Sequence, residues 1–269
     1  MNTPVIDFHA HVFPDAMARK VLPDLSENAG IDFFSDGTVN RLLEDMDDAG
    51  IDISLVSRIT TKPHQTDTIN QWLMNISGDR ILPMAAWHPD LPVSNGEIEC
   101  LKRKGFRCIK LHPDYQNFFV DEERAFPLYE SAQDAGMPVL VHAGPDRGLP
   151  PPVHALPENL LRVNGIFPGL KLIAAHMGGE DNYKDTLKYL AGTDVYLDTS
   201  FVLRKMPGDI LERMVKEHSA DRIIYGSDTP WNRQKEDIEF LFSLSYLNDD
   251  EKAKIAGKNA MELLGLHLP

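Results

Sequence analysis

Two histidines separated by one residue stand near the N-terminus, in the run VIDFHAHVFP. Residues two apart on a β-strand point to the same side, so His9 and His11 can grip a metal ion together. Other apolar runs also end on residues that carry chemistry, and five of the ten histidines close such runs. Besides the first pair, these chemistry-bearing residues are Lys110, His112, His142, His176 and Asp228. Their recurrence at run ends predicts one shared site.

Short apolar runs and amphipathic segments alternate along the chain, which predicts parallel strands joined by crossover helices. Eight such runs fit an α/β protein of the (β/α)8 TIM-barrel type, in which all strand C-termini meet at the active-site rim. A doubly wound open sheet is the alternative, but HAHVFP stands where a Gly-rich phosphate turn would follow the first strand. We expect one domain over residues 1–269, with long loops at 12–36 and after the fifth run. The expected strands are 5–11, 51–57, 81–88, 106–112, 137–143, 170–176, 195–200 and 222–228.

The composition narrows the possible partners. The formal net charge is −14 and no block of Lys and Arg occurs, which argues against nucleic acid or anionic lipid as a partner. No apolar run approaches the roughly 18 residues of a membrane helix, and the N-terminus does not resemble a secretory signal. Two cysteines without CxxC spacing favour a reducing, cytoplasmic location. The sequence is compatible with a homo-oligomer.

The motifs DFHAH, IKLHP, VLVHAG, AAHMGG and YGSDTPW together resemble the amidohydrolase superfamily of metal-dependent TIM-barrel hydrolases. The closest resemblance is to its amidohydrolase-related branch, which includes predicted hydrolases and aminocarboxymuconate semialdehyde decarboxylase. The resemblance implies that one metal ion is held by His9, His11, His142 and Asp228. It also implies that His176 is a catalytic histidine beside the metal.

Three neutral imidazoles and one carboxylate suit zinc, although manganese, iron or cobalt would also bind. Zinc can lower the pKa of bound water from about 15.7 to about 7. Asp228 can then take a proton and return it to the leaving group, while His176 contacts the developing oxyanion or acts as a further ligand. Some superfamily members bridge two metals with a carboxylated lysine, a role open to Lys110. Asp7 either orients a ligand histidine or caps nearby backbone.

Four residues are predicted to bind substrate. Arginines near a metal suit a carboxylate, and Arg58 and Arg204 each follow a strand end closely. His112 is expected to line the pocket, and Trp231 either forms an aromatic wall of the pocket or packs the last loop. Arg147 is a weaker candidate. His88 is expected at the rim or in the core, and no role is assigned to His64, His154, His218 and His267.

Two reactions fit these residues. The first is hydrolysis of a small amide, lactone or ester, favoured by the short chain and by the GSDTPW motif. The alternative is non-oxidative decarboxylation of an unsaturated or aromatic acid. A metal-binding barrel without turnover is a third hypothesis, against which His176 and Asp228 argue.

Overall fold

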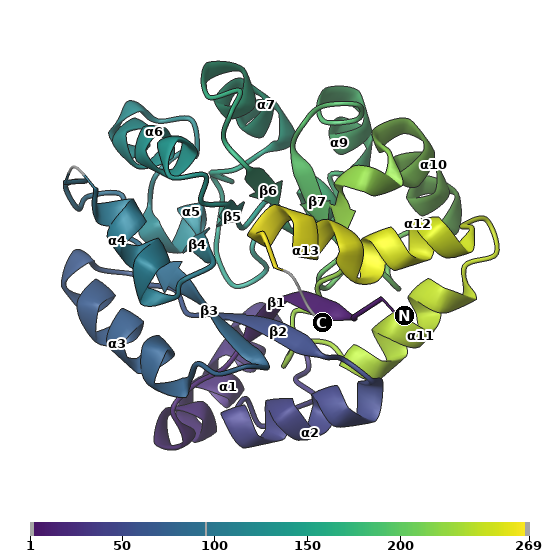
Figure 1. Cartoon of the computed structure of the whole chain (residues 1–269), viewed down its shortest axis with the longest axis horizontal. Helices are drawn as coiled ribbons and strands as arrows, with labels where there is room; N and C mark the ends of the chain where they lie inside the picture. Colours follow the sequence, from purple (N-terminus) through teal and green to yellow (C-terminus); the bar gives the residue numbers. More distant parts are fainter. Residues whose placement is uncertain (1–2, 95, 267–269) are drawn as a thin grey trace.

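The computed structural model describes residues 3–94 and 96–266. Within these ranges the centre is a sheet of eight parallel strands, paired in sequence order and ringed by helices (Figure 1). The strands are β1 (Ile6–His11), β2 (Ile53–Ser57), β3 (Ile81–Ala86), β4 (Cys108–Leu111), β5 (Val139–Val141), β6 (Leu172–Ala174), β7 (Tyr196–Asp198) and β8 (Ile223–Ile224).

Hydrogen bonds between β1 and the chain after β8 close the barrel. Phe8 N donates to Tyr225 O at 2.9 Å, and Asp228 N donates to His9 O at 2.8 Å. Because the first and last strands are joined, the sheet is a cylinder. The predicted (β/α)8 barrel is confirmed, and the open doubly wound sheet is wrong.

The helices connect the strands as the amphipathic pattern predicts. In α2, for example, Thr38 Oγ1 accepts a hydrogen bond from Arg41 N, Leu42 and Met46 are buried, and Gly50 ends the helix at φ 68°. A left-handed φ is easy for glycine, so the helix stops there. The helices are α1 (Asp15–Ala29), α2 (Val39–Ala49), α3 (Thr66–Ile76), α4 (Glu97–Lys104), α5 (Pro113–Gln116), α6 (Phe126–Asp134), α7 (Pro157–Ile166), α8 (Ala175–Gly178), α9 (Tyr183–Tyr189), α10 (Gly208–His218), α11 (Gln234–Ser243), α12 (Asp249–Ala253) and α13 (Asn259–Leu264). Short 3-10 turns are η1 (Pro63–Gln65), η2 (Glu123–Ala125) and η3 (Ala220–Arg222), and η4 (Lys254–Lys258) is a π-helical turn.

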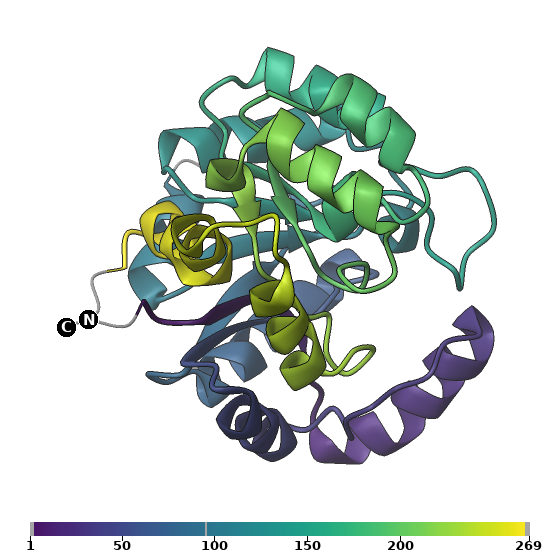
Figure 2. The same ribbon diagram turned by 90° about the vertical axis from the view of Figure 1, so that its right-hand side faces the viewer.

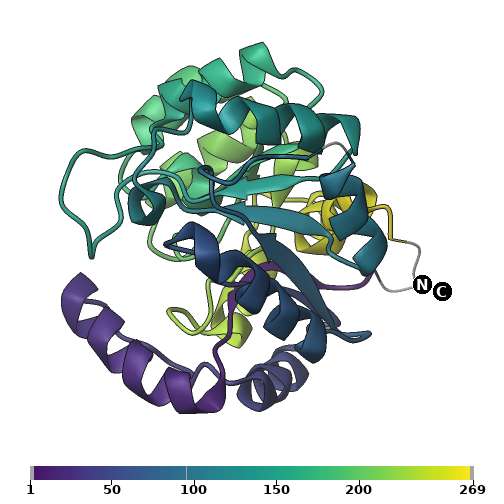
Figure 3. The ribbon, with the colours of Figure 1, turned by 90° about the vertical axis from the view of Figure 1, so that its left-hand side faces the viewer.

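The segment 12–36, predicted as a long loop, contains the 15-residue helix α1. Met17, Val21 and Leu25 recur every four residues, which is a helical spacing, and Gly30 ends the helix at φ 61°. The helix stands beside the barrel mouth, and its C-terminal end approaches the loop that follows β5 (Figures 2 and 3). This arrangement makes α1 a wall of the barrel mouth. No described helix is both long and apolar enough to cross a membrane.

Alternate strand residues fill the barrel. Phe8, Leu55, Cys108 and Leu140 belong to one buried cluster, which α13 covers at the end of the barrel where the strands begin (Figure 1). A second, larger cluster packs the outward strand residues against the helices. The next positions at the ends of β2, β4 and β7, and the first residue after β5, carry the polar side chains that form the site: Ser57, Lys110, Asp198 and His142.

Candidate metal centre

The predicted site residues meet at the C-terminal ends of the strands. His9, His11 and Lys110 lie within strands, whereas His112, His142, His176 and Asp228 follow strands that end one to four residues earlier. The expected strands 5–11 and 51–57 end where predicted, and the other six were too long at this end. The hydrogen-bonded pairing of the strands stops where the chain turns, and this turn brings these side chains over the barrel axis.

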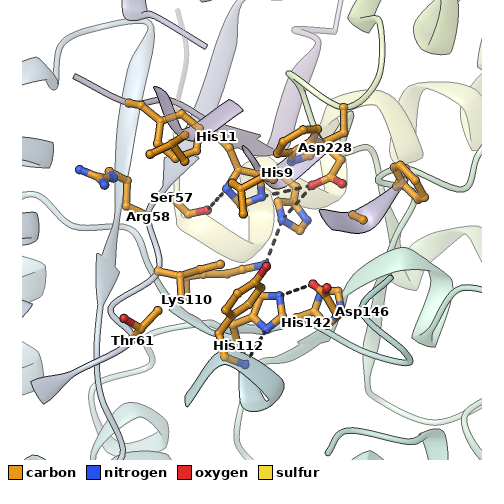
Figure 4. A pocket seen from close by; sticks show the side chains of 18 of the residues that line it. His9, His11, Ser57, Arg58, Thr61, Lys110, His112, His142, Asp146 and Asp228 are labelled. Carbon is orange, nitrogen blue, oxygen red and sulfur yellow. Dashed lines mark hydrogen bonds and ion pairs between the residues drawn. The ribbon is translucent and has the colours of Figure 1, made fainter. Parts of the chain in front are cut away.

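Three ligand-type atoms face one another at this rim (Figure 4). His11 Nε2 lies 3.2 Å and His9 Nε2 lies 3.5 Å from Asp228 Oδ1. Two atoms that bind one ion at about 2.1 Å, as in zinc sites, are roughly 3.0 to 3.4 Å apart. Ser57 Oγ lies 3.2 Å from His11 Nδ1, the nitrogen on the other side of that ring. The spacing of these three residues fits a divalent metal ion.

The electrostatics keep these groups in the states that bind metal. Burial, followed by the charge of Lys110, lowers the pKa of His9 to about 3, so its ring is neutral. Burial acts to raise the pKa of Asp228, but its contacts with the side chains of His11 and His9 outweigh burial and lower that pKa below its ordinary value. A neutral imidazole and an ionised carboxylate are the forms that coordinate.

Asp198, at the end of β7, fixes the orientation of His9. Its Oδ2 lies 2.8 Å from His9 Nδ1, so Nδ1 carries the proton and Nε2 presents its lone pair to the metal position. The other oxygen, Oδ1, accepts hydrogen bonds from His176 N and Ser200 N. Burial would raise the pKa of Asp198, yet its contacts with His9 lower it to about 2. Sequence reasoning missed this residue, although it lies in a strand end like the others.

His142 is oriented through His176. His176 Nδ1 lies 3.0 Å from Ser200 O and donates to it, which leaves Nε2 as an acceptor for His142 Nδ1 at 3.0 Å. His142 Nε2 therefore carries a lone pair, and it is a buried atom with no hydrogen-bond partner in the described chain. An orphaned acceptor of this kind fits a metal ligand. The close group of ligand atoms contains His9, His11 and Asp228 but not His142, so the role of His142 as the fourth ligand stays a prediction.

His142 lies next to His112 and Asp146, a second group with metal-ligating atoms. The rings of His112 and His142 are stacked 4.0 Å apart at 11°. Lone pairs of parallel rings lie in parallel planes and do not converge on one ion. His112 Nε2 instead faces Asp146 Oδ2 at 3.3 Å, which makes a hydrogen-bonded pair on the cavity wall.

Lys110 points directly at the candidate metal centre. Its Nζ lies 2.9 Å from His9 Nε2, the nitrogen whose lone pair faces the metal position. The side chain is buried, and burial lowers the pKa of Lys110 to about 8. The predicted bridging of a second metal stays a prediction.

Strained backbone and close packing set the positions of several of these groups. His176 and Asp228 adopt φ of 57° and 65°, a conformation that residues other than glycine rarely take. Such strain collects at functional sites, where the surrounding structure holds it. Gly226 allows β1 and the post-β8 segment to approach, since a methyl group there would lie 2.9 Å from His9 Cβ.

The cluster opens into a cavity of about 610 Å³. Of the predicted substrate-binding residues, Arg58, His112 and Trp231 line it, as does Arg147. Arg204 lies elsewhere, where its guanidinium pairs with Asp237 at 2.6 Å and with Glu236 at 2.9 Å. We therefore leave Arg204 out of the candidate substrate site.

Asp7 makes the backbone contacts that were one of its two expected roles. It accepts hydrogen bonds from His9 N and Ser227 N, and from the side chains of Ser227 and Gln234. The β1–β2 register shifts between Asp7 and Ala10, so the regular alternation of side chains along a strand is interrupted between Asp7 and the histidine pair.

Other histidines are spread over the fold. His88 is buried after the end of β3, where its Nδ1 accepts a hydrogen bond from Asp90 N. His64 lines the cavity, although no role was assigned to it. His154 and His218 contact Asp114 and the carbonyl of Leu190, respectively, and His267 lies outside the described residues.

The fold and the cluster are those of a metal-dependent barrel enzyme. A family model for amidohydrolases matches residues 6–266, so the chain belongs to the amidohydrolase family.

Three solved structures match this chain over nearly its whole length and over nearly their own whole length. An uncharacterized TIM-barrel protein from Bordetella bronchiseptica is 21% identical over 97% of this chain and 98% of its own, with a TM-score of 0.76. A dihydroxybenzoic acid decarboxylase from Polaromonas sp., with bound manganese and the inhibitor 2-nitroresorcinol, is 20% identical over 100% and 98%, with a TM-score of 0.75. A 5-carboxyvanillate decarboxylase from Sphingomonas paucimobilis is 15% identical over 99% and 100%, with a TM-score of 0.71. At these identities the likeness establishes the fold.

Proposed function

We propose that this protein is a metal-dependent, non-oxidative decarboxylase of an aromatic or unsaturated carboxylic acid. Arg58 carries the proposal. Its guanidinium lines the same cavity as His9, His11 and Asp228, which we call the metal cluster. It pairs with no carboxylate among the described residues. It lies instead over the rings of Phe13 and Trp72, at 5.5 Å and 5.4 Å from their centroids. A partly buried cation without an acidic partner suits a substrate carboxylate.

The similar solved structures also support this reaction over hydrolysis, because several of them are decarboxylases of aromatic acids. Two of those structures hold manganese. Histidine and carboxylate ligands accept manganese as well as zinc, so we propose manganese as the first metal to test.

His9, His11 and Asp228 would hold the ion, with His142 as the proposed fourth ligand. A bound divalent ion would act as a Lewis acid toward the oxygens of the acid. In the reaction the bond between the carboxyl carbon and its neighbour breaks, its electron pair stays on that neighbour, and CO2 leaves. A proton must then reach the same carbon.

We assign that proton transfer to Asp228, with His176 as the second cavity group able to hold a proton. Asp228 is ionised at rest, so it would first take up a proton from solvent and then pass that proton to the carbon. The proton consumed in each turnover comes from solvent, so the net change replaces the carboxylate by hydrogen and releases CO2.

Hydrolysis of a lactone, ester or amide is the second candidate, since the same cluster can serve it. The two reactions differ in their products. Protein loaded with manganese is incubated in D2O with a panel of hydroxybenzoates, unsaturated acids, lactones and amides. We expect CO2 release and one deuterium at the carbon that lost it. A hydrolysis product that takes up oxygen from labelled water, without CO2, would refute the proposal.

Arg58→Ala and Arg204→Ala form a matched pair of arginine variants. A hydrogen bond to a charged group contributes about 1.5–3 kcal/mol, so Arg58→Ala should raise KM for the acid by roughly 10- to 100-fold. Arg204→Ala should leave KM unchanged, because its partners lie outside the cavity. Equal KM values for the wild type and Arg58→Ala would refute the proposed contact between Arg58 and the substrate carboxylate.

A further inference from the structure

The helix α1 presents an unused apolar stripe to the cavity. Met17, Val21, Leu25 and Ala29 recur every four residues and all line the cavity. A different side of α1 packs on the protein, where Leu22 is buried and would lie 2.8 Å from a methyl group placed on Gly37. The stripe is therefore not needed to hold the helix in place.

The space along this stripe is bounded at both ends. Ala29 lies at the far end, where a methyl group on Gly148 would be 3.7 Å from its Cβ. This end of α1 approaches the loop after β5 (Figures 2 and 3). At the near end Arg58 Nη2 contacts Met17 Sδ at 2.9 Å. We call the part of the cavity along Met17, Val21, Leu25 and Ala29 the α1 trough. It begins at Arg58, the cation proposed to bind carboxylate, and ends at the loop after β5.

Phe13, Ile31 and Ile59 add further apolar side chains to the lining of the cavity. Polar groups of the cavity include Lys110, His112 and the metal cluster at the strand ends (Figure 4), and the lining is more apolar than polar in total. The whole volume of about 610 Å³ lies within the range of pockets that hold drug-sized ligands. A single-ring acid at the metal cluster would leave the α1 trough unfilled.

We infer that the α1 trough binds a hydrophobic extension of the substrate, and that the substrate is an aromatic or unsaturated acid carrying an alkyl or aryl group. This inference rests on the proposed function, because it places the acid at the metal cluster and Arg58. The extension would lie along Val21 and Leu25 and displace water from their side chains. Burial of apolar surface, which is not directional, would then supply affinity for a class of acids rather than for one molecule.

The test is a binding series on the manganese-loaded protein. Benzoate and its para-ethyl, para-butyl and para-hexyl derivatives are titrated by calorimetry. Each methylene that enters the trough should tighten Kd about fourfold, as expected for one buried CH2 group. A Kd that does not change with chain length would overturn the inference.

Leu25→Asp places a charge in the trough and should abolish the chain-length dependence while leaving the Kd of benzoate nearly unchanged. Asn28→Asp is the control, because it adds the same charge to an exposed position of α1 outside the cavity lining. If Leu25→Asp does not fold, Val21→Ser replaces it. An equal loss in both Asp variants would indicate a general charge effect and overturn the inference.

Three further outcomes separate the explanations. If benzoate binds without chain dependence and Leu25→Asp converts an oligomer to a monomer in sedimentation, a second copy covers the stripe and the inference fails. If Kd falls with alkyl chain length but no acid releases CO2, the inference about the α1 trough is supported and the proposed decarboxylation is refuted. If neither benzoate nor its derivatives bind, both fail.

Discussion

Replacing Asp198 by Asn tests whether this carboxylate prepares His9 for metal binding. Asn keeps an oxygen for the amides of His176 and Ser200, which lie 2.9 Å and 3.0 Å from Oδ1. It puts an uncharged group 2.8 Å from His9 Nδ1, so the proton on that nitrogen loses its anionic partner. His9 Nε2 then becomes a weaker ligand.

Loss of such a supporting carboxylate typically weakens metal affinity by roughly 10- to 100-fold, or about 1.4–2.7 kcal/mol. Asp198 is completely buried, so we also expect the metal-free protein to lose about 1–3 kcal/mol of unfolding free energy. Competition with a chromophoric chelator measures the affinity for manganese and zinc, and urea unfolding measures the stability separately.

Asp7→Asn is the control for this measurement. Asp7 is equally buried and lies two residues from His9, but it contacts the backbone amide of His9 and not the ring. Its replacement should leave metal affinity within about threefold, below the range expected for loss of a supporting carboxylate. Metal affinity of Asp198→Asn within that same range would refute the role assigned to Asp198.

Three further predictions concern packing, pH and metal. Gly226→Ala should cost about 1–3 kcal/mol of unfolding free energy and weaken metal binding, because the new methyl lies 2.9 Å from His9 Cβ. Gly208→Ala, with no atom within 4 Å of the new methyl, should be neutral, and equal losses would contradict this. Burial raises the pKa of Asp7 from 3.8 to about 6, so the folded chain holds that proton more strongly than the unfolded chain. The unfolding free energy should therefore fall by up to about 3 kcal/mol as the pH rises from about 4 to about 6, and Asp7→Asn should flatten this part of the curve. Identical pH curves for the two metal-free proteins would count against a buried, protonated Asp7. Removal of metal by a chelator should lower the melting temperature, since an ion at 100 times its Kd adds about 2.7 kcal/mol. An unchanged melting temperature after re-addition of manganese or zinc would argue against a metal site.

The barrel itself was predictable because its signals are local. Each strand is a short apolar run, and a glycine such as Gly50 after α2 marks where the helix before a strand ends. The meeting of His9, His11 and Asp228 also followed from this pattern, because parallel strands in a closed barrel bring their C-terminal ends to one rim.

Other features depend on contacts between segments far apart in the chain. The role of Asp198 depends on a bond across 189 residues to His9, and that of Asp7 on a register shift in β1 that parity does not reveal. Arg58 and Arg204 look alike in sequence, yet only the folded chain gives Arg204 two acidic partners and leaves Arg58 in the cavity.

The sequence by itself therefore determined the fold class and the residue types of a metal site. The hydrophobic periodicity and the residue types at strand ends depend only on short segments of sequence, so they can be recognised without coordinates. Only the tertiary structure decided which histidine nitrogen is free, which arginine is unpaired and that α1 walls an apolar trough. Each of these depends on which side chains from distant segments are adjacent after folding, and no short stretch of sequence carries that information.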